Sequence, residues 1–147
     1  MASVDACLET WQASDQRPDP IELLEQQNTN RLPWLIAERH RRMAKSPFAW
    51  FRGSAAVMAR DLGSRPNSGL TVQLCGDAHL LNFGFYASPE RTLVFDINDF
   101  DETFPGPWEW DLKRLLVSLV LVARPLGLDR EEQSCLVRKV ASRYRKA

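Results

Sequence analysis

The sequence predicts an α+β fold in which helices flank a small antiparallel β-hairpin or sheet. Helical spacing of apolar residues recurs from about residue 20 to Gly63. The pattern changes to the alternating one of extended strands between Leu70 and Ile97, and helical spacing returns from Trp108 onwards. Helices, a short β-region and helices again are typical of the α+β class, with polar loops gathered at the strand ends.

Three helices are predicted before Gly63. The segment Asp19-Pro20-Ile21-Glu22 combines a capping residue, a proline in the first turn and a glutamate three residues after the cap, so a helix is expected over about 20–29. A second, amphipathic helix with a basic outer face follows Pro33 and extends to about Met43. Ser46-Pro47 repeats the start signal, and a third helix is expected to continue without a break to Gly63.

The central segment predicts three short strands. Leu70–Cys75 has a β-branched centre and alternating apolar positions, which favours a strand. Phe83–Tyr86 and Thr92–Ile97 are expected to form a β-hairpin with a five-residue connection, 87–91. Pro105-Gly106-Pro107 is expected to end the extended region.

Two helices are predicted after the strands. Trp108–Arg124 is apolar nearly all round after Arg114, as expected of a helix that is buried centrally. Asp129 and Glu132 form a second capping signature, and the last helix is expected to end near Lys146.

Length and charge limit the possible functions. The 147 residues, 44% of them hydrophobic, suffice for one domain with its own core, expected over 19–147 after a loosely held arm, 1–18. Nineteen basic and nineteen acidic residues cancel, so no net field favours nucleic acid or an anionic membrane as a partner. The longest apolar segment, Leu115–Ala123, is too short to span a bilayer. Three widely separated cysteines and the lack of a secretory leader favour a reducing cytoplasm.

The most informative residues surround the predicted hairpin. Asp77 follows a strand and Gly76, Asn82 lies five residues later at the entry to the hairpin, and Asp99 lies at its far end. Phosphoryl transfer needs a carboxylate that orients the attacking hydroxyl and accepts its proton, together with oxygen ligands for Mg²⁺. We therefore predict Asp77 as the catalytic base and Asn82 and Asp99 as metal ligands. Asp96 competes with Asp99 for the second ligand position.

Two further side chains have open roles. His79 could contact phosphate or substrate, although a histidine in a tight loop more often fixes backbone carbonyls. Arg52, beside Gly53, could bind phosphate in a bidentate manner or form an ion pair with one of the site carboxylates.

The stretch Gly76-Asp77-x-His79-x-x-Asn82 resembles the catalytic loop of aminoglycoside phosphotransferases and related small-molecule kinases. Asp99-Phe100, Gly106-Pro107 and Asp111-Leu112 follow in the order seen in that superfamily. The resemblance implies the catalytic lobe of a kinase-like fold, with Mg²⁺ as cofactor and ATP as co-substrate. It also implies that Asp111 braces the catalytic loop by accepting backbone hydrogen bonds.

A closer resemblance is to the uncharacterised bacterial family called domain of unknown function 2252. The segments that carry it are 46–53, 75–84 and 95–114, with Asn98-Asp99-Phe100-Asp101-Glu102 and Trp108-Glu109-Trp110-Asp111. It covers about residue 30 to the C-terminus. The resemblance implies that this chain is the front portion of a longer protein, without the glycine-rich segment and lysine of the nucleotide-covering lobe.

Three functions are compatible with these residues. The first is a Mg²⁺-dependent ATP phosphotransferase whose acceptor is a small-molecule or protein hydroxyl. The second is a non-catalytic, truncated kinase-like binding module, in which a partner chain could complete the fold. The third is a metal-dependent phosphoester hydrolase that uses Asp77, His79, Asp96 and Asp99.

Overall fold

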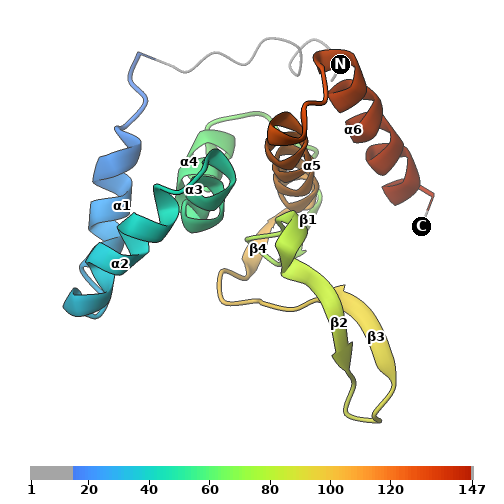
Figure 1. Ribbon diagram of the computed structural model, residues 1–147, viewed down its shortest axis with the longest axis horizontal. Coiled ribbons are helices and arrows are strands. Elements are labelled where there is room, and N and C mark those ends of the chain that lie inside the picture. The colour runs from blue at the N-terminus through green and yellow to red at the C-terminus, as the bar shows by residue number, and fades with distance from the viewer. Residues whose placement is uncertain (1–14, 147) are drawn as a thin grey trace.

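A computed structural model describes residues 15–146. Most of the arm expected over 1–18 therefore lies outside the described residues. The described part contains six α-helices and two small antiparallel sheets, which confirms the α+β class. In Figure 1 the helices are arranged side by side from α1 and α2 at one flank to α6 at the other.

The first two helices have nearly the predicted bounds. Helix α1 (Pro20–Asn28) begins at Asp19, whose carboxylate accepts a hydrogen bond from the backbone N–H of Ile21 at 2.8 Å. Helix α2 spans Pro33–Met43 and ends with basic residues in its last turn, which interact favourably with the helix dipole. Proline in the first turn starts each of them without loss of a helical hydrogen bond.

The prediction of one continuous third helix is wrong. The chain forms α3 (Pro47–Gly53) and α4 (Ala55–Gly63), separated at Ser54, whose φ and ψ are −127° and 41°. The Ser54 hydroxyl donates to the carbonyl of Trp50 at 2.8 Å and its backbone N–H donates to that of Phe51 at 3.2 Å. Serine thus satisfies the end of α3 locally, and the apolar spacing that suggested one helix continues across the break.

The β-region contains one strand more than predicted. Strand β1 (Thr71–Leu74) pairs with β4 (Phe104–Pro107), so the segment with two prolines continues the extended region instead of ending it. Two-stranded sheets leave every strand at an edge, where proline is tolerated because its missing N–H is not needed. The hairpin prediction is confirmed: β2 (Phe83–Ala87) pairs with β3 (Leu93–Ile97), and five residues connect them. The hairpin projects away from the helices (Figure 1).

The C-terminal helices are α5 (Glu109–Ala123) and α6 (Arg130–Tyr144), joined through a short 3-10 turn over Arg124–Leu126. The predicted capping box is confirmed, because the side chains of Asp129 and Glu132 bond each other's backbone N–H. The expectation that α5 would be buried through apolar residues needs correction. Its buried residues are Arg114, Ser118 and Ala123, two of which are polar.

The apolar core is small and lies among the N-terminal helices. Leu24, Met43 and Val57 are buried together, with Leu23 and Trp50 packed against them. No helix within residues 15–146 has both the length and the apolar character needed to cross a membrane.

Candidate functional site

The candidate site is built on the loop between β1 and β2. The loop turns at Gly76, which has a left-handed backbone conformation with φ +85°. A Cβ atom at this position would collide with the backbone carbonyl of Glu102. A glycine is therefore required by both the conformation and the close approach of the segment after β3.

Asp111, in the first turn of α5, fastens the start of the loop. Its Oδ2 accepts a hydrogen bond from the backbone N–H of Cys75 at 2.7 Å, and its Oδ1 accepts one from Gly76 at 3.1 Å. This is the hydrogen-bonding arrangement that the resemblance to kinases implied. Burial raises the pKa of Asp111, and the two N–H donors oppose that shift.

Asp77 follows directly and is paired with a buried arginine. The Nε of Arg114 donates to Oδ1 of Asp77 at 2.5 Å. Arg114 has only 3% of its side chain exposed, and its Nη2 donates to the carbonyl of Phe51 at 2.7 Å while its Cζ lies 4.1 Å from the Phe51 ring centre. Burial raises the pKa of Asp77, and Arg114 acts in the opposite direction. One carboxylate oxygen is thus fixed by α5, and the other remains available.

Asn82 connects the two segments that carry the site carboxylates. Its Nδ2 donates to the backbone carbonyls of Asp77 at 3.1 Å and Asp99 at 3.0 Å, and lies 3.4 Å from the Sγ of Cys75. The side chain is buried. No residue among 15–146 donates a hydrogen bond to Oδ1 of Asn82. It remains available as an oxygen ligand.

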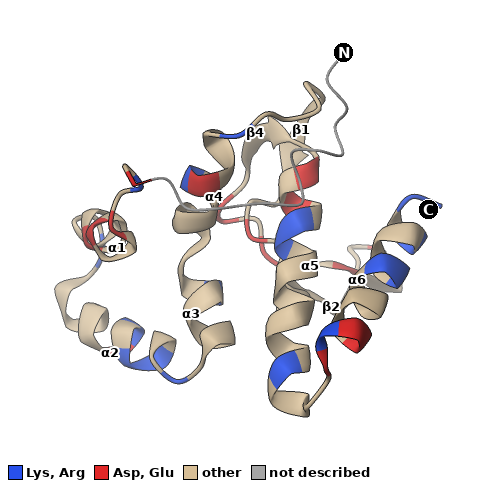
Figure 2. Ribbon diagram, turned by 90° about the horizontal axis from the view of Figure 1, so that it is seen from above, with Lys and Arg blue, Asp and Glu red and all other residues tan. Residues whose placement is uncertain are grey.

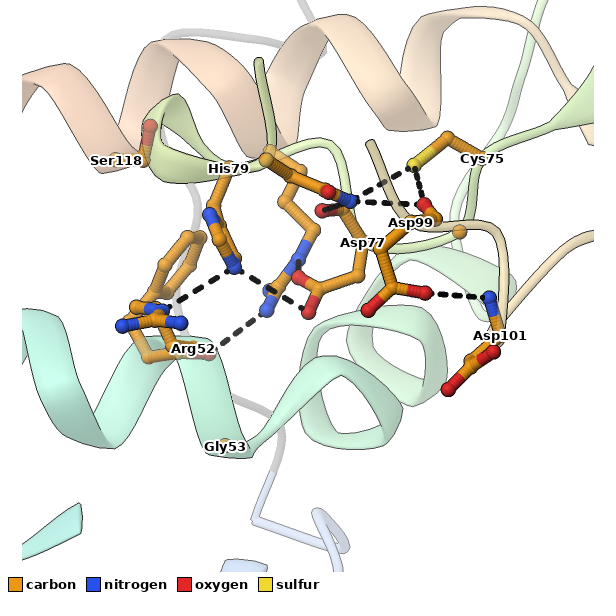
Figure 3. A network of polar contacts seen from close by, with 12 residues as sticks. Arg52, Gly53, Cys75, Asp77, His79, Asp99, Asp101 and Ser118 are labelled. Carbon is orange, nitrogen blue, oxygen red and sulfur yellow. Dashed lines mark hydrogen bonds and ion pairs between the residues drawn. The ribbon is translucent and has the colours of Figure 1, made fainter. Parts of the chain in front are cut away.

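The carboxylate of Asp99 lies near that of Asp77. Figure 3 shows both groups directed into the same space, and the charge of Asp99 contributes to the raised pKa of Asp77. The Oδ1 of Asp99 accepts a hydrogen bond from the backbone N–H of Asp101 at 3.0 Å, which orients the group. Asp99 is exposed, so solvent and ligands can reach it.

Asp96 is not part of this cluster. It lies in β3 opposite Gly84, is exposed, and accepts a hydrogen bond from the backbone N–H of Ile97 at 2.8 Å. No group of three His, Cys, Asp or Glu side chains in the described part of the chain could hold a metal ion. Asp99 and Asn82 nevertheless supply a carboxylate and an amide oxygen, which are donors of the kind that Mg²⁺ prefers.

His79 and Arg52 form the other side of the site. His79 Nε2 accepts from Arg52 Nε at 3.3 Å and lies 3.6 Å from Oδ2 of Asp77 (Figure 3). Burial, with Arg52 as the next cause, lowers the pKa of His79 to about 4, so the ring is neutral at pH 7. Its Nδ1 is buried without a hydrogen-bond partner. Neither ring nitrogen bonds a backbone carbonyl of the described residues, and Arg52 forms no ion pair with their carboxylates.

Sequence reasoning missed Arg114 and Ser118. The Ser118 hydroxyl accepts from the backbone N–H of Leu80 at 2.9 Å and donates to the carbonyl of Leu115 at 2.6 Å, so it holds the second half of the loop. A usable signal was present: Asp111, Arg114 and Ser118 are spaced three and four residues apart in a largely apolar helix, which places three polar side chains on one face.

Comparisons with known proteins give a family but no activity. No curated protein and no solved structure is significantly similar to the chain. A family model described as an uncharacterised protein conserved in bacteria matches residues 31–147, which include every residue of the candidate site. The chain therefore belongs to this bacterial family, domain of unknown function 2252.

Proposed function

We propose that this chain carries the catalytic loop of a Mg²⁺-dependent phosphotransferase that uses ATP and a hydroxyl acceptor. Asp77 is the base, and Asn82 and Asp99 are the metal ligands. Bound Mg²⁺ would neutralise charge on the phosphates of the nucleotide. The acceptor oxygen attacks the γ-phosphorus as its proton passes to Asp77, and the bond from that phosphorus to the oxygen of the ADP leaving group breaks.

The observation that carries the proposal is the fixation of Asn82. Its amide nitrogen bonds the carbonyls of both Asp77 and Asp99, which ties the base and the second ligand to one side chain. In the described residues the buried polar atom without a partner is Nδ1 of His79, so Oδ1 of Asn82, which receives no hydrogen bond from residues 15–146, is open to solvent and to a ligand.

The environment of Asp77 also suits a base. Arg114 holds Oδ1, so the side chain has one orientation and Oδ2 can meet a hydroxyl group. The opposing effects of burial and Arg114 keep the carboxylate basic without leaving its charge unbalanced.

Calorimetry with Mg·ATP tests the metal ligands. Asp99→Asn is expected to weaken Mg·ATP binding about 10-fold or more, because it removes a charged ligand of the cation. Asp96→Asn is the matched control, since Asp96 is an exposed aspartate three residues away and outside the cluster. Equal affinities for the wild-type and Asp99→Asn proteins would refute the assignment of Asp99.

Transfer of the γ-phosphate tests the base. Asp77→Asn keeps the shape of the side chain and should reduce transfer at least about 100-fold while Mg·ATP still binds. Unchanged transfer in this variant would rule out Asp77 as the base.

A non-catalytic binding module is the second candidate, and the hairpin favours it. Phe85, Leu93 and Phe95 are 60–71% exposed on β2 and β3, and a partner chain could cover them. Absence of Mg·ATP binding in the wild-type protein would favour this function. The hydrolase alternative has less support, because Asp96 lies outside the cluster and His79 is engaged by Arg52.

A further inference from the structure

The charges around Asp77 are unevenly divided between its two sides. Arg114 neutralises Asp77 directly, through the ion pair in the buried part of the site. Arg52, in α3, is a second guanidinium on this side of the site and has no carboxylate partner within 4.0 Å among residues 15–146. His79, which lies between Arg52 and Asp77, is neutral at pH 7. This side of the site therefore carries one surplus positive charge.

The geometry of Arg52 leaves its two terminal nitrogens available. Arg52 is exposed near the end of α3, and its Nε is oriented by the 3.3 Å contact with His79 Nε2. No residue in the described range accepts a hydrogen bond from Nη1 or Nη2 of Arg52. A guanidinium fixed at Nε and open at both Nη atoms presents a fork that matches the oxygens of phosphate or carboxylate.

Basic character extends beyond Arg52 on this side. Arg39 of α2 donates from Nη2 to the carbonyl of Gly53, the residue after Arg52, at 2.6 Å. Figure 2 shows basic residues on α2 and α3, and acidic ones near the ends of β1 and β4. The site thus has a positive half at Arg52 and a negative half at Asp99.

The two halves lie on opposite sides of the catalytic carboxylate. In Figure 3, Asp99 and Arg52 flank Asp77, with His79 between Arg52 and Asp77. If nucleotide and metal occupy the Asp99 side, the acceptor must approach Asp77 from another direction. The Arg52 side offers a guanidinium that has no carboxylate partner among residues 15–146.

We propose that Arg52 binds an anionic group, a phosphate or carboxylate, on the acceptor whose hydroxyl meets Asp77. The inference rests on the proposed phosphotransferase function and adds a substrate class to it: an acceptor that carries both a hydroxyl and a negative charge. Arg52 acts as a binding residue, and the imidazole of His79 positions it.

Inorganic phosphate, added without metal or nucleotide, is the probe. Binding is followed through the NMR signals of the His79 ring, which are readily assigned because the chain has two histidines. Phosphate should shift these signals in a saturable manner, and Arg52→Gln should weaken binding about 10- to 100-fold because a charge-assisted bidentate contact is lost. Arg52→Lys keeps the positive charge but lacks the two forked N–H donors. Its affinity for phosphate should therefore lie between those of the wild-type and Arg52→Gln proteins.

Arg60→Gln is the control, because Arg60 is also exposed and lies on the next helix, α4, outside the hydrogen-bond network of the site. Phosphate binding that is absent from the wild-type protein, or equal in the Arg52→Gln and Arg60→Gln variants, would overturn the proposal.

A second arm separates an acceptor anion from a phosphate of the nucleotide. Once nucleotide binding has been established by calorimetry, phosphate is titrated in the presence of saturating Mg²⁺ and a non-hydrolysable ATP analogue. Retained phosphate binding supports the acceptor assignment, and displacement by the analogue overturns it. Because the first arm contains neither metal nor nucleotide, failure of Mg·ATP binding would count against the phosphotransferase proposal alone.

Discussion

Arg114 is the residue that most changes the interpretation of the site. A buried guanidinium needs a compensating charge, and Asp77 supplies it at 2.5 Å. Asp77 in turn would be costly to keep ionised in this half-buried position without Arg114. Each side chain therefore stabilises the charged state of the other, and the loop is attached to α5 by an ion pair as well as by the hydrogen bonds of Asp111.

Replacement of Arg114 by methionine is expected to destabilise the protein by about 3–5 kcal/mol, because Asp77 is left as an uncompensated buried charge. Asp77→Asn removes that charge, so the double variant should be less destabilised than the sum of the single variants. Urea unfolding of the four proteins measures this coupling. Additive losses would show that the ion pair does not stabilise the fold.

His79 makes stability dependent on pH. Its pKa is about 4 in the folded protein, against the ordinary value of 6.5, so folding favours the neutral ring. Above pH 6.5 this contribution is fully present. As the pH falls from 6.5 to about 4, the unfolded chain takes up a proton that the folded one does not, and stability is lost by up to about 3 kcal/mol.

The His79→Asn variant should lack this part of the pH dependence, whereas His40→Asn, on the exposed side of α2, serves as the control. Unfolding free energies measured from pH 7 to pH 4 provide the comparison. A slope that is the same in the wild-type and His79→Asn proteins would contradict the assignment.

At this scale the sequence predicted the proximity of Asp77, Asn82 and Asp99, because strand and loop positions place all three near the base of one hairpin. It could not predict the partners of Arg52 or Arg114. Guanidinium pairings join residues that are far apart in sequence, such as Arg114 and Asp77, and depend on how α3, α5 and the loop pack. Spacing alone contains no information on that packing.

Among the structural elements, the loop after β1 depends most on a single backbone conformation. Gly76→Ala should destabilise the protein by more than about 2 kcal/mol and disturb the site, because a positive φ is combined with a collision with Glu102. Gly69→Ala is a matched control, since Gly69 has φ +76° and no heavy atom within 4 Å of an added Cβ.

The Gly69 variant should therefore show the conformational cost alone, about 1 kcal/mol. Thermal unfolding of the two variants measures the difference between them. Similar losses in both would mean that the segment after β3 does not restrict residue 76.

The sequence predicted the ends of helices and strands correctly where local capping or turn residues set them. The prediction was wrong where contacts between distant segments set them. Asp19 and Asp129 each start a helix through their own side chain, so both starts were predictable. The break at Ser54 and strand β4 were not. The helix breaks at Ser54 although the helical spacing of apolar residues continues across this position. Strand β4 is extended because it pairs with β1, which lies about thirty residues earlier in the chain.

At the scale of the whole molecule, stability depends on a small core. Leu24→Ala should cost about 2–5 kcal/mol, because Leu24 is 2% exposed and contributes to the cluster with Met43 and Val57. Ile21→Ala, on the same helix but 47% exposed, should cost less than about 1 kcal/mol. Chemical denaturation of both variants tests whether the N-terminal helices contain the dominant core.

The pairing of β1 with β4 has a consequence for the order of folding. It closes a loop that contains Asp77, Asn82 and Asp99, whereas Asp111 and Arg114 follow it in sequence. Closing a segment of this length costs entropy before its contacts repay it, so such pairings form late. During synthesis, helices α1 to α4 can assemble early, but the loop between β1 and β2 obtains its contacts with Asp111 and Arg114 only after α5 has emerged from the ribosome.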